Sequence, residues 1–135
     1  MVIDSSALIA LLLNEPETVR FTTAIAHAQV RWVSAASYLE TAIVLLRRSG
    51  PGARQILDRL FDDLSLHKVP FTREQAELAI TAFQRYGKGQ GHPAGLNFGD
   101  CFTYALAKQT SEPVLFKGND FSLTDLESAI NGSPP

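Results

Sequence analysis

Four carboxylates lie along the 135-residue chain at positions where a folded sheet can bring them together. Asp4 follows a short β-branched run at the start, and Asp120 lies in a polar turn after another apolar run. Glu40 and Asp100 stand near the predicted starts of two helices. Gathered carboxylates repel one another unless a cation lies between them, and such oxygen ligands suit Mg²⁺ or Mn²⁺. A site with one or two of these ions can activate water for in-line attack on a phosphodiester.

Each acid also has a plain structural interpretation. Asp4 can cap the helix after it, and Asp100 suits the positive end of a helix dipole. Glu40 lies three residues after Ser37, so that Ser37-x-x-Glu40 forms a capping box of its own. Asp120 falls in a Gly-Asn-Asp turn, where acids are common. The joint placement of the four acids at one sheet edge, rather than any single acid, favours a site.

The elements that must position these acids alternate along the chain. Short apolar runs predict strands at 2–3, 30–33, 66–69 and 114–116. Between and after them, helices are predicted at 5–13, 16–28, 34–49, 51–65, 72–86, from Asp100 onward, and at 123–130. This alternation predicts an α/β fold, a three-layer α/β/α arrangement with a short, mostly parallel central sheet. We expect one domain over residues 1–130 and a tail at 131–135.

Apolar stripes indicate which helix faces should meet the core. We expect three helices to be buried along the following residues: Leu39, Ile43 and Leu46; Ile56, Leu60 and Leu64; and Ala76, Ala79, Ile80 and Phe83. The helix that Asp100 opens is apolar almost all round, which predicts burial on most sides. In a parallel sheet, ligands bind outside the carboxyl ends of the strands, and Asp4 should stand there.

Composition narrows the function classes. A net charge of −2, from 12 Lys and Arg against 14 Asp and Glu, argues against nucleic-acid binding by bulk electrostatics. It is compatible with an enzyme that has carboxylates at its centre and basic residues around them.

The longest apolar run, 7–13, is too short to span a membrane, and no basic segment precedes it as in a signal peptide. The single cysteine, Cys101, excludes an internal disulfide and suits a reducing cytosol, so we expect a cytoplasmic protein with a packed, inert thiol.

Four motifs together resemble a known family. They are Val2-Ile3-Asp4-Ser5-Ser6-Ala7, Ser37-Tyr38-Leu39-Glu40, Gly99-Asp100-Cys101-Phe102-Thr103-Tyr104-Ala105-Leu106-Ala107 and Gly118-Asn119-Asp120-Phe121. In order, spacing and residue type they resemble PIN-domain ribonucleases, and more narrowly the VapC-type toxins of bacterial toxin–antitoxin pairs. The resemblance covers essentially the whole chain, and the first and third motifs are its most specific parts.

The resemblance implies a metal-dependent endoribonuclease in which Asp4, Glu40 and Asp100 ligate Mg²⁺, with Mn²⁺ as an alternative, and Ser6 assists beside Asp4. Many relatives carry a fourth acid in a Thr-x-Asp-x-x-Phe pattern, which this chain does not reproduce. Asp120 supplies the carboxylate in that turn here, and we take it as an outer or second-metal ligand.

The resemblance also implies partners. The expected substrate is cellular RNA, a tRNA or a ribosomal loop, and a small VapB-type antitoxin is expected to block the site of a homodimer. Basic residues that can contact RNA phosphates are Arg47, Arg48, Arg85, Lys88 and Lys117. The RNA, the cleavage site, the antitoxin and the number of metals are not defined by the sequence.

Two other functions fit the same residues. One is a phosphohydrolase on a similar sheet, with Asp4 as nucleophile. That chemistry usually has a second acid in an Asp-x-Asp arrangement, and Ser6 occupies this place. The other is a catalytically silent module that only binds an antitoxin. A metal-dependent RNA cleavage assay and mass spectrometry for a phosphoryl-aspartate distinguish the three.

Overall fold

The computed structural model describes residues 1–130, and the predicted tail at 131–135 lies outside them. Its centre is a sheet of four short strands in the order β3-β2-β1-β4, with all neighbouring pairs parallel. The strands are β1 (Val2–Ile3), β2 (Trp32–Ser34), β3 (His67–Val69) and β4 (Val114–Leu115). This order places β4 at one side of the sheet, directly beside β1, so Asp4 and the loop after β4 lie next to each other at the carboxyl ends of the strands.

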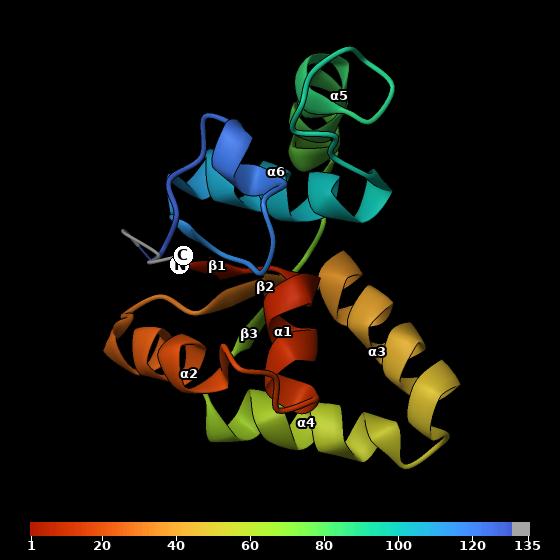
Figure 1. Ribbon diagram of the computed structural model, residues 1–135, viewed down its shortest axis with the longest axis vertical. Helices are drawn as coiled ribbons and strands as arrows, with labels where there is room; N and C mark the ends of the chain where they lie inside the picture. Colours follow the sequence, from red (N-terminus) through yellow and green to blue (C-terminus); the bar gives the residue numbers. More distant parts are fainter. Residues whose placement is uncertain (131–135) are drawn as a thin grey trace.

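Helices cover both faces of this sheet (Figure 1). On one face lie α1 (Ser5–Leu12), α2 (Thr18–His27), α3 (Ala35–Ser49) and α4 (Ala53–Asp63). On the other lie α5 (Arg73–Tyr86), α6 (Phe98–Thr110) and the 3₁₀ turn η1 (Phe121–Leu123). The predicted three-layer α/β/α fold is confirmed.

The alternation of strand side chains produces two separate cores. Val2 and Val114 pack with α5 and α6, whereas Ile3 and Leu115 pack with the helices of the opposite face. All four strand residues are at most 1% exposed, because a strand covered on both faces has no side chain left for solvent.

Side-chain caps set the helix starts around the sheet edge. Asp4 caps α1, Ser34 caps α3 and Thr72 caps α5, each accepting a hydrogen bond from a backbone N–H in the first turn. Asn97 caps α6 in a reciprocal capping box. The predicted capping box of Ser37 with Glu40 is wrong, because α3 begins two residues earlier, after Ser34.

The three helices are present, but the predicted inner faces of α3 and α5 are wrong, and that of α4 is right only in part. In α3 the stripe of Leu39, Ile43 and Leu46 is 40–59% exposed, and the residues that face the protein interior are Ser37, Thr41, Ala42 and Leu45. In α4 the buried residues are Ala53, Leu57 and Phe61. Leu60 and Leu64 of the predicted face are partly buried against the same core, whereas Ile56 is 60% exposed. In α5 the buried residues are Gln75, Ala82 and Tyr86.

The predicted helix at 123–130 is also wrong. After η1 the chain runs beside β4 instead, where Val114 N–H donates to Glu127 O at 2.9 Å and Ala129 N–H donates to Val114 O at 2.8 Å. These bonds satisfy the free edge of β4, which a helix would have left unpaired. Among the described residues, no helix has the length and apolar character to cross a membrane.

Candidate active site

Asp4 follows β1 directly and is only 2% exposed. Its Oδ2 accepts hydrogen bonds from Ser6 N at 3.0 Å and Ser6 Oγ at 2.7 Å, and its Oδ1 accepts one from Thr103 Oγ1 at 2.6 Å. Burial raises the pKa of Asp4 above the usual aspartate value, against the opposing effect of these donors. The capping interpretation of Asp4 is therefore confirmed, but its carboxylate also reaches across the fold to α6.

Ser6 connects Asp4 to the loop after β4. The Lys117 backbone N–H donates to Ser6 Oγ at 3.0 Å, which leaves the Ser6 hydroxyl proton for Asp4. The Lys117 ammonium in turn pairs with Glu15 and lies 3.5 Å from Glu17 Oε2. Ser6, which the resemblance implies assists beside Asp4, thus contacts the Asp4 carboxylate through both its hydroxyl and its backbone N–H.

Asp100 occupies the first turn of α6 and is 8% exposed. Its Oδ2 accepts the Asn97 N–H at 2.9 Å, while Asn97 Oδ1 accepts the Asp100 N–H at 2.9 Å. The pKa of Asp100 is raised to about 7, chiefly by burial. The negative charges of Asp4, Asp120 and Glu40 raise the pKa further, against the Asn97 hydrogen bond.

Glu40 comes from α3 and lies against α6 at Gly99. A β-carbon built on Gly99 would stand 2.1 Å from Glu40 Oε2, so the carboxylate occupies the space that any other residue at position 99 would fill. This contact places the Glu40 carboxylate beside the residue that precedes Asp100.

Asp120 lies in the loop after β4, at the start of η1, with an exposed side chain that makes no capping hydrogen bond. Its charge acts on Asp100, so it faces the same edge as the other acids. Asp4, Glu40 and Asp120 are therefore all near enough to Asp100 for their charges to act on its carboxylate.

The donor set is compatible with a hard divalent cation, because it consists of carboxylate oxygens at a site whose buried acids are energetically costly when ionised. The side chains do not form a closed cage: within residues 1–130, no three Asp, Glu, His or Cys side chains are close enough together to enclose an ion. Glu40 and Asp120 are less buried than Asp4 and Asp100.

Thr103 and Ser37 were not predicted from the sequence as residues of the site. Thr103 donates to Asp4, and Ser37 Oγ lies 3.3 Å from Thr103 Oγ1. Both hydroxyls are at most 1% exposed. A signal was present in the spacing: Thr103 lies three residues after Asp100 and Ser37 three before Glu40, which places each hydroxyl on the same helix face as an acid.

Cys101 is next to Asp100 but is not an activated nucleophile. Burial raises the pKa of its thiol, and Asp100 adds to that rise. Its Sγ donates to Asn97 O at 3.3 Å. The packed, inert thiol expected from the sequence agrees with these contacts.

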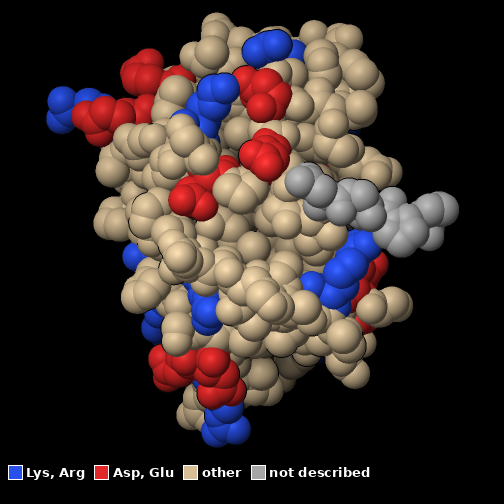
Figure 2. Space-filling view, turned by 90° about the vertical axis from the view of Figure 1, so that its left-hand side faces the viewer, with Lys and Arg blue, Asp and Glu red and all other residues tan. Residues whose placement is uncertain are grey.

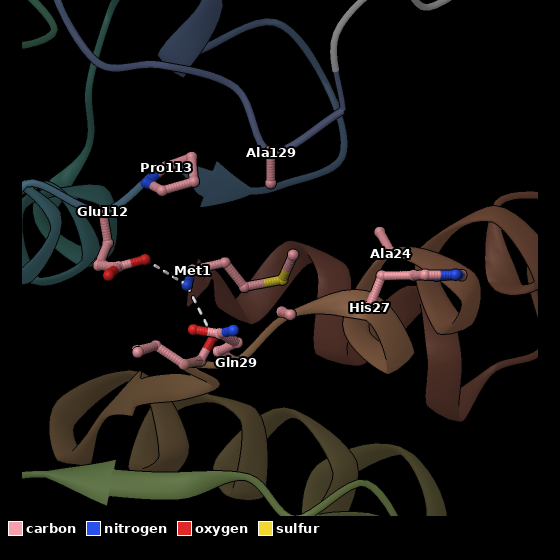
Figure 3. A pocket seen from close by; sticks show the side chains of 9 residues that line it. Met1, Ala24, His27, Gln29, Glu112, Pro113 and Ala129 are labelled. Atoms are coloured by element: carbon pink, nitrogen blue, oxygen red, sulfur yellow. Dashed lines mark hydrogen bonds and ion pairs between the residues drawn. The ribbon is translucent and has the colours of Figure 1, made fainter.

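Other surfaces of the molecule lie away from the four acids. A hollow of about 480 Å³ lies near the start of β1, lined among others by His27 and Ala129 (Figure 3). There the Met1 amine donates to Val30 O at 2.7 Å and pairs with Glu112 at 2.6 Å. Figure 2 shows the face at the amino ends of the strands, where the described basic and acidic residues lie in small mixed groups.

Comparisons with known proteins agree with this arrangement. The family model described as PIN domain matches residues 1–126. Ribonuclease VapC28 of Mycobacterium tuberculosis is 47% identical over 131 residues, covering 97% of this chain and 98% of the relative. Ribonuclease VapC of Mycolicibacterium smegmatis is 52% identical over 127 residues, covering 93% and 97%. The crystal structure of M. tuberculosis VapC20, described as a sarcin-ricin loop cleaving toxin, has a TM-score of 0.75 at 18% identity over 98% of both chains, which shows a shared fold.

Proposed function

The chain belongs to the PIN-domain family, among its VapC-type ribonucleases, and from this membership and the geometry of the site we propose that it is a metal-dependent endoribonuclease toxin. The observation that carries the proposal is the gathering of acids around the buried Asp100: the Glu40 carboxylate lies against Gly99, and Asp4, Glu40 and Asp120 are near enough for their charges to raise the pKa of Asp100. Neighbouring carboxylates at the carboxyl ends of parallel strands are suited to holding a cation.

Asp4, Glu40 and Asp100 would hold Mg²⁺ or Mn²⁺, and Asp120 would serve as an outer or second-metal ligand. When bound, such an ion lowers the pKa of coordinated water and stabilises charge on a phosphodiester. The roles of the chain's own residues follow from their contacts. The buried Asp4 presents a fixed carboxylate, and Glu40 reaches in from α3 over Gly99. The exposed Asp120 is the acid that can orient a water molecule or a substrate hydroxyl at the open side.

The proposed substrate is cellular RNA, a tRNA or a ribosomal RNA loop, met in the cytoplasm. The names of the relatives, which are ribonucleases, support the RNA class. Exposed Arg47 and Arg48 end α3, and exposed Lys88 lies in the loop before α6, where each can contact phosphates. Arg85 and Lys117 are less available, because they pair with Asp125 and with Glu15.

We also propose a VapB-type antitoxin as partner and a homodimer as the assembled state. Two apolar surfaces support protein partners. One is the exposed stripe of α3, and the other is a groove of about 570 Å³ between α5 and α6. Apart from Gln84, the groove is lined by apolar side chains, which include Phe71, Phe98 and Phe102. Exposed apolar patches of this kind commonly mark interaction sites.

The test is cleavage of total cellular RNA by the purified protein, followed by sequencing of the new 5′ ends. Discrete cut sites that appear with Mg²⁺ or Mn²⁺ support the proposal, and they also identify the RNA. A stable phosphoryl-aspartate at Asp4 by mass spectrometry, without RNA cleavage, would favour the phosphohydrolase alternative. Antitoxin binding with neither activity would favour the silent module.

A further inference from the structure

Two buried hydroxyls connect the three elements that carry the proposed metal ligands. Thr103 comes from α6, and its hydroxyl hydrogen-bonds Asp4 at the end of β1. Ser37 comes from α3, and its hydroxyl contacts the Thr103 hydroxyl. Within each helix the hydroxyl lies three residues from an acid, Thr103 from Asp100 and Ser37 from Glu40. The hydroxyls are more buried than those acids, so they lie behind the site rather than at its mouth.

The direction of the hydrogen bonds follows from the donor inventory. An ionised carboxylate only accepts, so Thr103 gives its single hydroxyl proton to Asp4 Oδ1 at 2.6 Å. The contact of 3.3 Å between Ser37 Oγ and Thr103 Oγ1 must then use the proton of Ser37. The two hydroxyls form a relay in which Ser37 orients Thr103 and Thr103 orients Asp4.

The relay also distinguishes the two oxygens of Asp4. A carboxylate has about four acceptor positions, two on each oxygen. Oδ2 accepts from both Ser6 N and Ser6 Oγ, which uses its two positions. Within residues 1–130, Oδ1 accepts one hydrogen bond of normal geometry, from Thr103, which leaves one position, and the Ser5 backbone N–H adds a weaker interaction with the same carboxylate. Oδ1 is therefore the oxygen of Asp4 with capacity for a cation, and Thr103 sets its direction.

We infer that Thr103, supported by Ser37, is a positioning residue that directs Asp4 Oδ1 toward the bound metal and thereby sets the metal affinity of the site. The inference rests on the proposed function, since it concerns the metal that Asp4 would hold. Partners that hydrogen-bond a ligating carboxylate typically affect metal affinity 10–100-fold when removed.

The experiment measures Mn²⁺ affinity directly, from the electron paramagnetic resonance signal of free Mn²⁺ during titration of the metal-free protein. Thr103→Val removes the hydroxyl at nearly constant volume, and Thr103→Ser keeps it. Thr110→Val is the matched control, because Thr110 is also on α6 and its hydroxyl donates within that helix, to Leu106 O at 2.7 Å. Circular dichroism confirms that each variant is folded.

We expect Thr103→Val to weaken Mn²⁺ binding about 10-fold or more, with Thr103→Ser and Thr110→Val close to wild type. Ser37→Ala should cause a smaller loss, and none in addition to Thr103→Val, because Ser37 acts through Thr103. The inference is overturned if Thr103→Val binds Mn²⁺ with wild-type affinity, or if Thr103→Ser loses as much affinity as Thr103→Val. It is also overturned if the losses from Ser37→Ala and Thr103→Val add up in the double variant. If Thr103→Val does not fold, Ser37→Ala decides, and unchanged affinity there overturns it.

This design separates the inference from the proposed function. Wild-type protein that binds Mn²⁺ and cleaves RNA, together with Thr103→Val that binds equally well, refutes only the relay. Wild-type protein that neither binds Mn²⁺ nor cleaves RNA refutes the proposed function, and the inference with it.

Discussion

The carboxylate of Glu40 lies where a side chain at position 99 would have to begin: a β-carbon on Gly99 would stand 2.1 Å from Glu40 Oε2 and 2.9 Å from Glu40 Cδ. The two residues come from different helices, α3 and α6. The absence of a side chain at Gly99 is thus what lets Glu40 approach Asp100. Gly99 is a helical residue without a positive φ, so conformational freedom does not explain its presence.

Gly99→Ala should separate activity from stability. The new methyl group must displace the end of the Glu40 side chain, which is flexible, and alanine favours a helix over glycine by up to about 1 kcal/mol. We expect an unchanged or slightly higher melting temperature with about 100-fold less RNA cleavage, since displacement of a catalytic group by 1 Å can cost that much.

Gly52→Ala is the control for the same change, because a β-carbon on Gly52 meets no atom within 4 Å. It should cleave RNA at the wild-type rate. Full activity in Gly99→Ala would show that the position of Glu40 against Gly99 does not matter for catalysis.

The metal-free protein should lose stability as the pH rises from about 4 to about 7. The pKa of the Asp100 carboxyl is 3.8 when unperturbed, as in the unfolded chain, and about 7 in the folded protein. Between these pH values the folded protein therefore binds a proton that the unfolded chain has lost. The stabilising free energy of this extra proton is fully present below pH 3.8 and is lost as the pH rises through about 7. It corresponds to at most about 4 kcal/mol. Asp4 contributes in the same direction, because burial raises its pKa.

Chemical denaturation across this pH range checks the slope. Asp100→Asn keeps an acceptor for the Asn97 N–H but carries no charge, so its free energy of unfolding should depend less on pH and exceed that of wild type near pH 8. Asp62→Asn, on the exposed side of α4, should follow the wild-type curve. Equal slopes for Asp100→Asn and wild type would mean that Asp100 is not destabilised by its surroundings.

Growth arrest tests the toxin assignment in cells. The acidic edge is uncompensated without metal, so a natural inhibitor should insert Arg or Lys there. Expression of the chain alone should stop growth, and co-expression of the adjacent small gene should restore it. Asp100→Asn, expressed at the same soluble level, should be harmless. Normal growth with abundant folded wild-type protein would count against a toxin.

The fold was predictable because its signals are local. Apolar runs before Asp4 and before Asp120, with capped helices between them, lead to a parallel sheet whose carboxyl edge gathers the acids. The helix faces were not predictable in the same way. In α3 the polar Ser37 and Thr41 are buried and Leu39 is 59% exposed, because hydrogen bonds within the fold satisfy the hydroxyls.

The details of the site depend on contacts between distant segments. Thr103 and Asp4 are 99 positions apart, and the fit of Glu40 against Gly99 arises only when α3 packs on α6. The last segment is a similar case. Residues 123–130 have a pattern compatible with a helix, but pairing with the free edge of β4 outweighs that local preference.

The central claim is that carboxylates of one site hold the ion on which RNA cleavage depends, and a single series of assays tests it most directly. Wild type and Asp100→Asn are stripped with EDTA, then assayed for RNA cleavage and for the melting-temperature rise that Mn²⁺ produces. The account predicts no cleavage by stripped wild type, restoration by Mg²⁺ or Mn²⁺, and a metal-dependent rise in melting temperature. It predicts that Asp100→Asn loses both responses while remaining as stable as metal-free wild type or more so. Robust cleavage by wild type in excess chelator, or an intact Mn²⁺ response in Asp100→Asn, would contradict the account.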